Sequence, residues 1–99
     1  ALPDGLVILI SPISGQGLFT IKDFPEGTHF GESHYHHGQF GKIDRMALGA
    51  FYNHSELPNT ERIEGVKNDD GSYSSYLVTI NPIKAGDEIL VKYKMYDPT

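Results

Sequence analysis

The chain has 99 residues, which is enough for one domain spanning residues 1–99 and too few for a second. Because it contains no cysteine, these residues cannot form a disulfide, a thiolate zinc site or a cysteine nucleophile. Eight Lys and Arg against thirteen Asp and Glu give a net charge of -5, which argues against a nucleic-acid partner and favours a basic one. The same modest acidity can also simply keep a small domain soluble.

The first third of the chain predicts three strands separated by turns. Leu6 to Ile10 is a run of aliphatic residues suited to a pleated surface, and Ser11-Pro12 ends it. A second short strand is expected from Leu18 to Ile21. The turn residues Pro25-Glu26-Gly27 then allow the chain to extend from Thr28 to Tyr35.

The middle of the chain predicts one helical turn and one hairpin. The helical turn is expected from Asp44 to Leu48. Asn68-Asp69-Asp70-Gly71 favours a tight turn, because Asn, Asp and Gly adopt positive φ at little cost, so Arg62 to Lys67 and Tyr73 to Ile80 are expected to pair.

The last predicted strand runs from Glu88 to Tyr93 and follows turn residues at Ala85-Gly86. Its period of two places Ile89, Val91 and Tyr93 on one face. The expected fold class is therefore mainly β, made of small curved sheets of short strands with little helix.

No segment indicates a membrane or secretory role. The longest aliphatic run, Leu6 to Ile10, is far below the roughly 20 residues that a membrane helix needs. No basic stretch followed by an apolar stretch resembles a signal peptide. The sequence predicts a soluble protein without a membrane partner, intracellular rather than secreted.

Three motifs occur in a characteristic order: Gly15-Gln16-Gly17, then Phe51-Tyr52-Asn53-His54-Ser55 with Pro58-Asn59, then Gly86-Asp87-Glu88-Ile89-Leu90 leading to Tyr93. This order resembles the SET-domain family of protein-lysine methyltransferases, in particular its very small viral members. The resemblance implies a SET-type β-clip with a C-terminal pseudoknot. It also implies S-adenosylmethionine-dependent methyl transfer to a lysine of a protein or peptide substrate.

The resemblance assigns the cofactor side of the site to Gly15, Gln16, Gly17, Asn53 and His54. The glycines would let the backbone approach S-adenosylmethionine, and the two polar side chains would hold its amino-acid and adenine portions. Read alone, the glycine motif is an ordinary β-turn, and Asn53 could equally satisfy its own backbone.

On the chemical side, the resemblance makes Tyr93 the catalytic residue. A phenol with a pKa near 10 is a poor base at neutral pH, so its expected role is to orient the lysine amine and stabilise charge. Tyr52 would line the lysine channel, and Tyr96 or Met95 would cover the adenine. An arbitrary strand tyrosine would instead pack in the core with its hydroxyl at the edge.

Two alternatives stay open. Only a short stretch from about Gly38 to Gly49 stands where many SET proteins carry one wall of the peptide groove, which favours a catalytically silent SET-like module that binds cofactor or peptide. A homodimer could also complete this groove. The histidines offer a third interpretation, a metal-binding β-domain, because His34 and His36 share a strand face. His37 points away, and a third ligand would have to come from His54 or Asp44. Solvated or mutually hydrogen-bonded histidines are the simpler reading.

Overall fold

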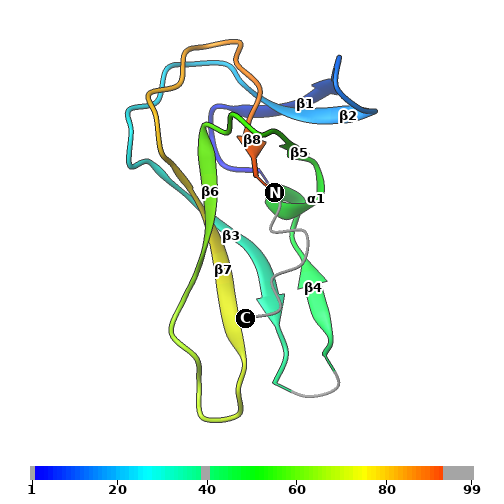
Figure 1. The fold of residues 1–99 in the computed structure, drawn as a ribbon, viewed down its shortest axis with the longest axis vertical. Coiled ribbons are helices and arrows are strands. Elements are labelled where there is room, and N and C mark those ends of the chain that lie inside the picture. Colours follow the sequence, from blue (N-terminus) through cyan, green and yellow to red (C-terminus); the bar gives the residue numbers. More distant parts are fainter. Residues whose placement is uncertain (1, 39–40, 93–99) are drawn as a thin grey trace.

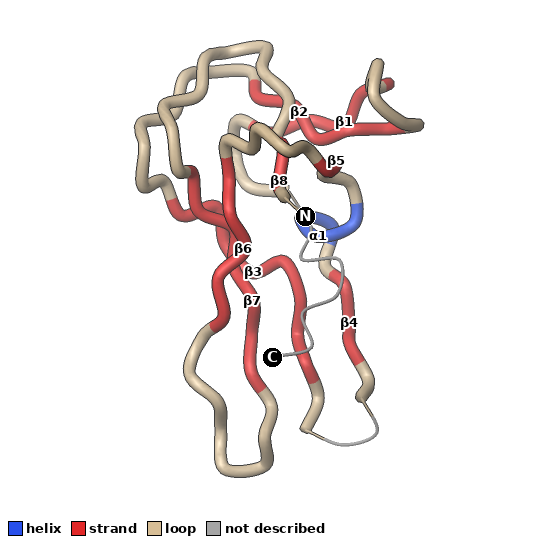
Figure 2. Tube along the Cα trace, in the orientation of Figure 1, coloured by secondary structure: helices blue, strands red, loops and turns tan. Residues whose placement is uncertain are grey.

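The computed structural model describes residues 2–38 and 41–92, and most of its regular structure is strand (Figure 1, Figure 2). One helix occurs within these residues, α1 (Ala47–Ala50). The strands are β1 (Leu6–Ile10), β2 (Gln16–Thr20), β3 (His29–His36), β4 (Ile43–Arg45), β5 (Asn53–His54), β6 (Thr60–Glu64), β7 (Tyr73–Thr79) and β8 (Leu90–Val91).

Strands β1 and β2 form a separate two-stranded antiparallel sheet at one end of the molecule (Figure 1). The pairing runs from Leu6 opposite Thr20 to Ile10 opposite Gln16. The first strand has the predicted bounds. The second begins at Gln16 rather than Leu18, because its backbone pairs with β1 almost to the turn.

The other six strands form one sheet in the order β4-β3-β7-β6-β8-β5. The predicted hairpin is confirmed, since β6 and β7 pair antiparallel from Thr60 opposite Thr79 to Glu64 opposite Ser75. Its first strand, however, ends at Glu64 rather than running from Arg62 to Lys67. Its turn contains the backbone hydrogen bond from Gly71 N to Asn68 O at 2.9 Å, and Gly71 has φ +86°, which a side chain would disfavour.

The expected helical turn was misplaced. Asp44 and Arg45 belong to strand β4, whose residues pair with His34 to His36 of β3, and the helix begins only at Ala47. Cross-strand pairing therefore overrides the local preference up to Met46, whose N–H donates to Ser33 O at 2.9 Å. The expectation held only for the last part of that segment.

Strand β8 lies between β5 and β6 and runs parallel to both, so a late segment is inserted between two earlier ones (Figure 1). The regular pairing covers Leu90 and Val91, while Glu88 makes an isolated bridge to Phe19. Ile89 and Val91 are 0% and 2% exposed, which confirms their predicted inward face. Tyr93, predicted for the same face, lies outside the described residues.

The core connects the two sheets. Its buried apolar residues come from both sheets, from α1 and from the segment before β8: Leu6, Leu18, Phe30, Leu48, Leu77, Ile83, Ile89 and Val91. Burial of such side chains is the main favourable term in folding. The predicted class, mainly β with small curved sheets and little helix, is confirmed. Within the described residues no helix has the length and apolar character needed to span a bilayer.

Candidate active site

The predicted glycine motif lies at the tip of the β1–β2 hairpin. Ser11 N donates to Gly15 O at 2.8 Å and closes the turn, and Gly15 has φ +48° with no heavy atom within 4 Å of where a Cβ would stand. Gly17 differs, because a Cβ there would overlap Glu88 Oε2 and come within 3.0 Å of Ser11 Cβ. The lack of a side chain therefore leaves open space at Gly15 and makes room for a carboxylate at Gly17.

Asn53 joins the middle motif to this turn. It is half-buried on β5, and its Nδ2 faces Ser14 O at 3.3 Å and Gln16 O at 3.4 Å, and donates to Glu88 Oε2 at 2.7 Å. Three acceptors around one nitrogen fix which end of the carboxamide points inward. The structure thus brings together the turn and Asn53, which are nearly forty positions apart.

Glu88 is a residue whose role the sequence analysis missed. Its carboxylate accepts the Ser11 hydroxyl at 3.0 Å through Oε1 and 2.9 Å through Oε2, in addition to the Asn53 amide. We call Ser11, Asn53 and Glu88 the Glu88 cluster. The signal was present in Gly86-Asp87-Glu88-Ile89-Leu90, but that run was interpreted as a strand and as one of the three ordered motifs, with no role given to Glu88 itself.

Asn59, from the Pro58-Asn59 part of the motif, holds the backbone on which Glu88 sits. Its Nδ2 donates to Glu88 O at 2.8 Å, and its Oδ1 accepts Leu90 N–H at 2.9 Å. These two bonds imitate a strand pairing on both sides of Ile89. Asn59 therefore has a positioning role that the sequence analysis did not assign.

His54 follows Asn53 on β5, and its Nε2 lies 3.7 Å from Glu56 Oε1. Both ends of β5 are fixed by parallel pairing, with Asn53 opposite Leu90 and His54 opposite Val91. The middle motif is thereby held against the last described strand. The cofactor roles of Gly15, Gln16, Gly17, Asn53 and His54 are consistent with this arrangement and stay predictions.

Tyr52, the residue before Asn53, lines a cleft of about 1080 Å³. We call it the histidine cleft. Its described lining residues come from β3, β4, α1, β6 and β8 and the segments beside them: His34, Arg45, Gly49, Ala50, Tyr52, Pro58, Thr60, Glu61, Arg62, Ile63, Glu64, Ile80, Val91 and Lys92. The Tyr52 ring meets the His34 ring edge-on, with centroids 6.5 Å apart.

His34 and His36 point to one face of β3, as predicted, but they are buried rather than solvated, at 7% and 9% exposure. His34 Nδ1 lies 3.0 Å from Ser33 Oγ, and His36 Nε2 lies 2.8 Å from Ser75 Oγ. The serine hydroxyls satisfy imidazoles that the sheet has taken out of water.

Their surroundings disfavour protonation of both rings. Burial, then the charge of Arg62, lowers the pKa of His34 to about 4, and His36 and Arg45 add to the effect. Burial and Arg62 also lower the pKa of His36, against the opposing charge of Glu64. At neutral pH the cleft is therefore lined by a neutral imidazole, that of His34, beside the positive guanidinium groups of Arg45 and Arg62.

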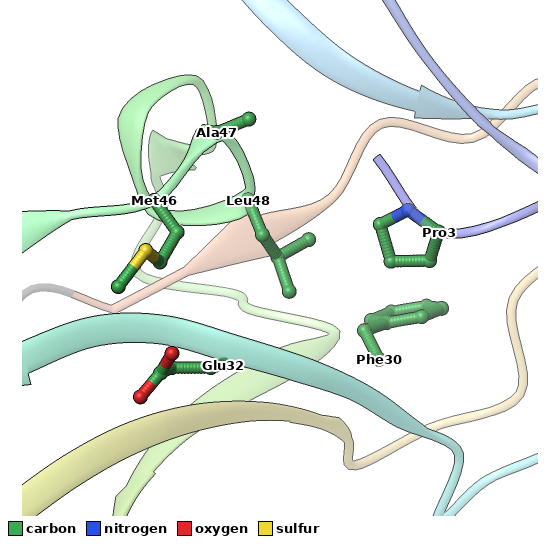
Figure 3. Close-up of a pocket in the computed structure, with 6 residues that line it drawn as sticks. All are labelled: Pro3, Phe30, Glu32, Met46, Ala47 and Leu48. Atoms are coloured by element: carbon green, nitrogen blue, oxygen red, sulfur yellow. The ribbon is translucent and has the colours of Figure 1, made fainter. Parts of the chain in front are cut away.

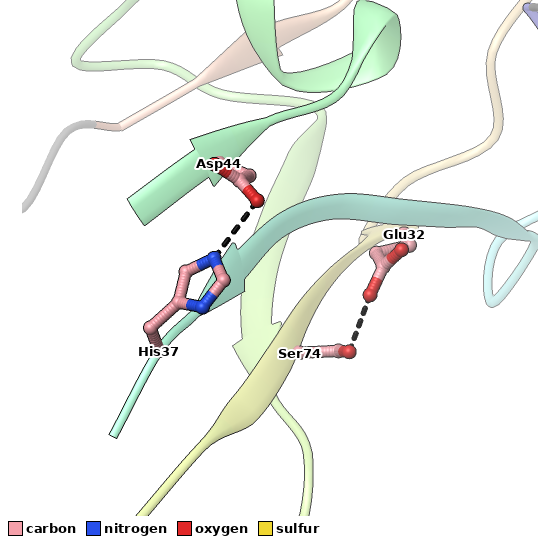
Figure 4. Close-up of polar contacts among 4 residues, drawn as sticks. All are labelled: Glu32, His37, Asp44 and Ser74. Atoms are coloured by element: carbon pink, nitrogen blue, oxygen red, sulfur yellow. Dashed lines mark hydrogen bonds and ion pairs between the residues drawn. The ribbon is translucent and has the colours of Figure 1, made fainter. Parts of the chain in front are cut away.

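His37 points away from the other two histidines and bonds Asp44 of β4, with Nε2 and Oδ2 2.8 Å apart (Figure 4). The same hydrogen bond holds the pKa of Asp44 below its usual value. Glu32 and Ser74 form a second polar contact on the neighbouring strands. Across residues 2–38 and 41–92, no three His, Asp or Glu side chains gather as a metal site would require, so the metal-binding alternative gains no support.

A smaller pocket of about 300 Å³ lies between α1 and β3 (Figure 3). It is lined by Pro3, Phe30, Glu32, Met46, Ala47 and Leu48. In the described part of the segment from about Gly38 to Gly49, where many SET proteins carry one wall of the peptide groove, this chain has only β4, with three residues, and the single turn of α1. Tyr93 and Tyr96, with Met95, lie outside the described residues, and their predicted roles stay predictions.

Comparison with known proteins gives a consistent result. The SET domain family profile matches residues 32–94. The chain is similar to a candidate histone methyltransferase of Plasmodium falciparum, with 19% identity, a TM-score of 0.75, and coverage of 96% of this chain and 97% of that one. No curated protein sequence gives a significant match.

The chain is also similar to a chain in Polycomb Repressive Complex 2 of Chaetomium thermophilum. A humanized mutant of that complex bound to the inhibitor GSK126 gives 21% identity and a TM-score of 0.73, covering 100% of this chain and 16% of the other. A mutated apo form gives 20% identity and a TM-score of 0.71, covering 95% and 15%. At these identities the structural likeness establishes the fold, and the chain spans under a fifth of these Polycomb chains.

Proposed function

The chain belongs to the SET-domain family, and on that premise we propose that it transfers a methyl group from S-adenosylmethionine to a lysine side chain of a protein or peptide. The observation that carries the proposal is the convergence of three motifs. The Asn53 amide lies against Ser14 O and Gln16 O of the glycine turn and donates to Glu88 of the last motif.

The chemistry of the Glu88 cluster fits the amino-acid part of this cofactor. Because Nδ2 of Asn53 faces inward, the carboxamide oxygen is left as an acceptor on a half-buried side chain. An acceptor oxygen backed by a carboxylate favours a cationic amino group over an anion. The open space at Gly15 would let the turn backbone come close to a ligand.

The reaction needs a neutral lysine amine held in line with an electrophilic methyl group, which S-adenosylmethionine supplies when bound. Removing the proton from a free lysine costs roughly 4.6 kcal/mol at pH 7, and a narrow apolar channel reduces this cost by disfavouring the ammonium. Tyr93 would orient the amine, and Tyr52 would line the channel beside Asn53. Tyr96 would cover the adenine.

A second candidate function is a SET-like module that binds cofactor or peptide without transfer. It is favoured by the small wall formed by β4 and α1, which leaves little surface to hold a substrate. The same small wall supports the minimal, viral-type form of the domain, and a homodimer would then extend the groove. That residues 1–99 form a single SET-like domain, and that the protein is soluble, are also proposals.

Methyl transfer from radiolabelled S-adenosylmethionine to a mixed peptide panel tests the proposal. We expect label on lysine with the natural chain and loss of most transfer in Tyr93→Phe, with folding and S-adenosylhomocysteine binding retained. Full activity in Tyr93→Phe would remove that residue from catalysis. Binding of S-adenosylhomocysteine without any transfer would favour the silent module.

A further inference from the structure

The histidine cleft is rich in positive side chains, although the whole chain is negatively charged. The chain carries a net charge of -5 and contains only two arginines, Arg45 and Arg62, and both line this cleft. Lys92 adds a third positive group, against Glu61 and Glu64. An acidic protein therefore concentrates its guanidinium groups at one concave site.

The two arginines point to the same face of the sheet. Arg45 on β4 is the direct antiparallel partner of His34 on β3, so their side chains share a face. On the other side, Glu64 on β6 pairs with Ser75, which pairs with His34, and Arg62 lies two residues from Glu64 on the same face. Both guanidinium groups are also close enough to depress protonation of His34 between them.

Neither arginine forms an ion pair within the part of the chain that the structure describes. The close contacts between basic and acidic side chains found in residues 2–38 and 41–92 join Lys22 to Asp4, His37 to Asp44, and both His54 and Lys92 to Glu56. Arg45 and Arg62 are exposed and enter none of these pairs. Guanidinium groups form their strongest contacts with carboxylate or phosphate oxygens, so two unpaired ones at a concave site suit an anionic group.

We propose that the histidine cleft binds an anionic side chain of the substrate, so that the enzyme prefers lysines with an acidic or phosphorylated residue a few positions away. The inference rests on the proposed function for the location of the lysine. Tyr52 lines the cleft and the next residue, Asn53, belongs to the Glu88 cluster, so the anion site begins one residue from the cofactor side. Because His34 is neutral, Arg45 and Arg62 are the groups that would bind the anion.

The test uses the whole chain and sets of short peptides with a central lysine, differing at one neighbouring position by Glu, Gln or phosphoserine. We expect at least one Glu peptide to show a KM about tenfold below its Gln partner at similar kcat, the size of one charge-assisted contact. A phosphoserine peptide that surpasses Glu would identify phosphate as the preferred anion. Arg45→Gln and Arg62→Gln should each reduce the ratio of the two KM values several-fold.

Lys84→Gln is the matched control, because it removes one positive charge from an exposed residue outside the cleft and should leave the ratio unchanged. Equal KM values for Glu, Gln and phosphoserine peptides at every position would overturn the proposal, as would an unchanged ratio in Arg62→Gln.

Peptide binding measured by fluorescence anisotropy, with S-adenosylhomocysteine present, separates this inference from the proposed function. A preference for Glu in binding without any methyl transfer would uphold the anion site and contradict the enzyme. Methyl transfer with no preference for a charged peptide would support the proposed enzyme activity and contradict the anion site. Absence of both binding and transfer would overturn the anion site as well.

Discussion

The Glu88 cluster and the histidine cleft meet at two consecutive residues, Asn53 in the cluster and Tyr52 in the cleft, and they differ in how their charged groups are paired. In the cluster, the Glu88 carboxylate is met by donors from Ser11 and Asn53. In the cleft, Arg45 and Arg62 enter none of the ion pairs of the described chain. A satisfied network fixes geometry, whereas unpaired charge is available to a ligand.

This difference predicts that mutations in the two regions affect stability differently. Residues of the Glu88 cluster should matter for stability as well as for ligand binding, because removing one leaves half-buried partners unsatisfied. The cleft arginines should matter for binding alone, because exposed charges without partners contribute little to folding. The following experiments test this contrast in order of expected size.

The largest effect is expected for Glu88→Ala, which deprives the Ser11 hydroxyl and the Asn53 amide of their shared acceptor. The free energy of unfolding in urea should fall by about 3 kcal/mol, because the Ser11 hydroxyl loses its acceptor, at about 1–3 kcal/mol, and the Asn53 amide loses its shortest hydrogen bond, which is to a carboxylate. Glu88→Gln keeps an acceptor and should lose about 1 kcal/mol. Equal stability of Glu88→Ala and the natural chain would show that the cluster is not a structural unit.

A smaller effect is expected from acidification, because the pKa of His34 is lowered from 6.5 to about 4 in the folded state. Protonation then favours the unfolded chain, so this contribution to stability is complete above about pH 6.5 and is lost as the pH falls towards 4. Between pH 7 and pH 4.5 the loss should be about 2 kcal/mol.

Urea unfolding is measured at both pH values for the natural chain and for His34→Gln. The difference between the two proteins isolates the contribution of His34 from that of the carboxylates, which titrate in both. The charged groups that act on His34 are Arg62, His36 and Arg45, and they are present in both. The variant should lose about 2 kcal/mol less stability on acidification. Parallel pH profiles would contradict the buried, neutral state assigned to this ring.

The two glycines of the turn give the third comparison. Gly17→Ala should cost about 2 kcal/mol, because the new methyl group displaces the Glu88 carboxylate. Gly15→Ala meets no neighbour and should cost about 1 kcal/mol through its φ of +48° alone. Thermal unfolding of the two variants would sharpen the contrast, and a more stable Gly17→Ala would break it.

The smallest effect on folding is expected for Arg62→Gln. Because this arginine belongs to no ion pair of the described chain, its removal should change the free energy of unfolding by less than about 0.5 kcal/mol. Chemical denaturation of the variant provides the check. A loss as large as that of Glu88→Ala would mean that the cleft, too, is an internally satisfied structure.

The sequence predicted the fold class and the hairpin around Asn68 to Gly71, because turn residues and period-two patterns act locally. It misplaced the helical turn at Asp44, where pairing of β4 with β3 decides the conformation. It also did not predict the order of the six-stranded sheet, in which β8 is inserted between β5 and β6. That order depends on contacts between distant segments.

For the site, motif order correctly placed Asn53 beside the glycine turn but assigned Glu88 and Asn59 no role. Both act through hydrogen bonds to residues at least 29 positions away, which no local pattern reveals. The histidines were expected to be solvated or hydrogen-bonded to each other, because Ser75, the partner of His36, lies on a distant strand that the local pattern does not show. The burial of His36 with Ser75 depends on the pairing of β3 with β7, which the sequence alone did not show.

The most direct test of the central claim is calorimetric titration of S-adenosylhomocysteine into the natural chain and into Asn53→Ala. We expect one binding site per chain. The affinity of the variant should be at least about tenfold weaker, because the ligand's amino group would lose its charge-assisted contact with the carboxamide oxygen of Asn53. Circular dichroism of the variant must match that of the natural chain. A natural chain that does not bind, or a folded variant that binds equally well, would contradict the account.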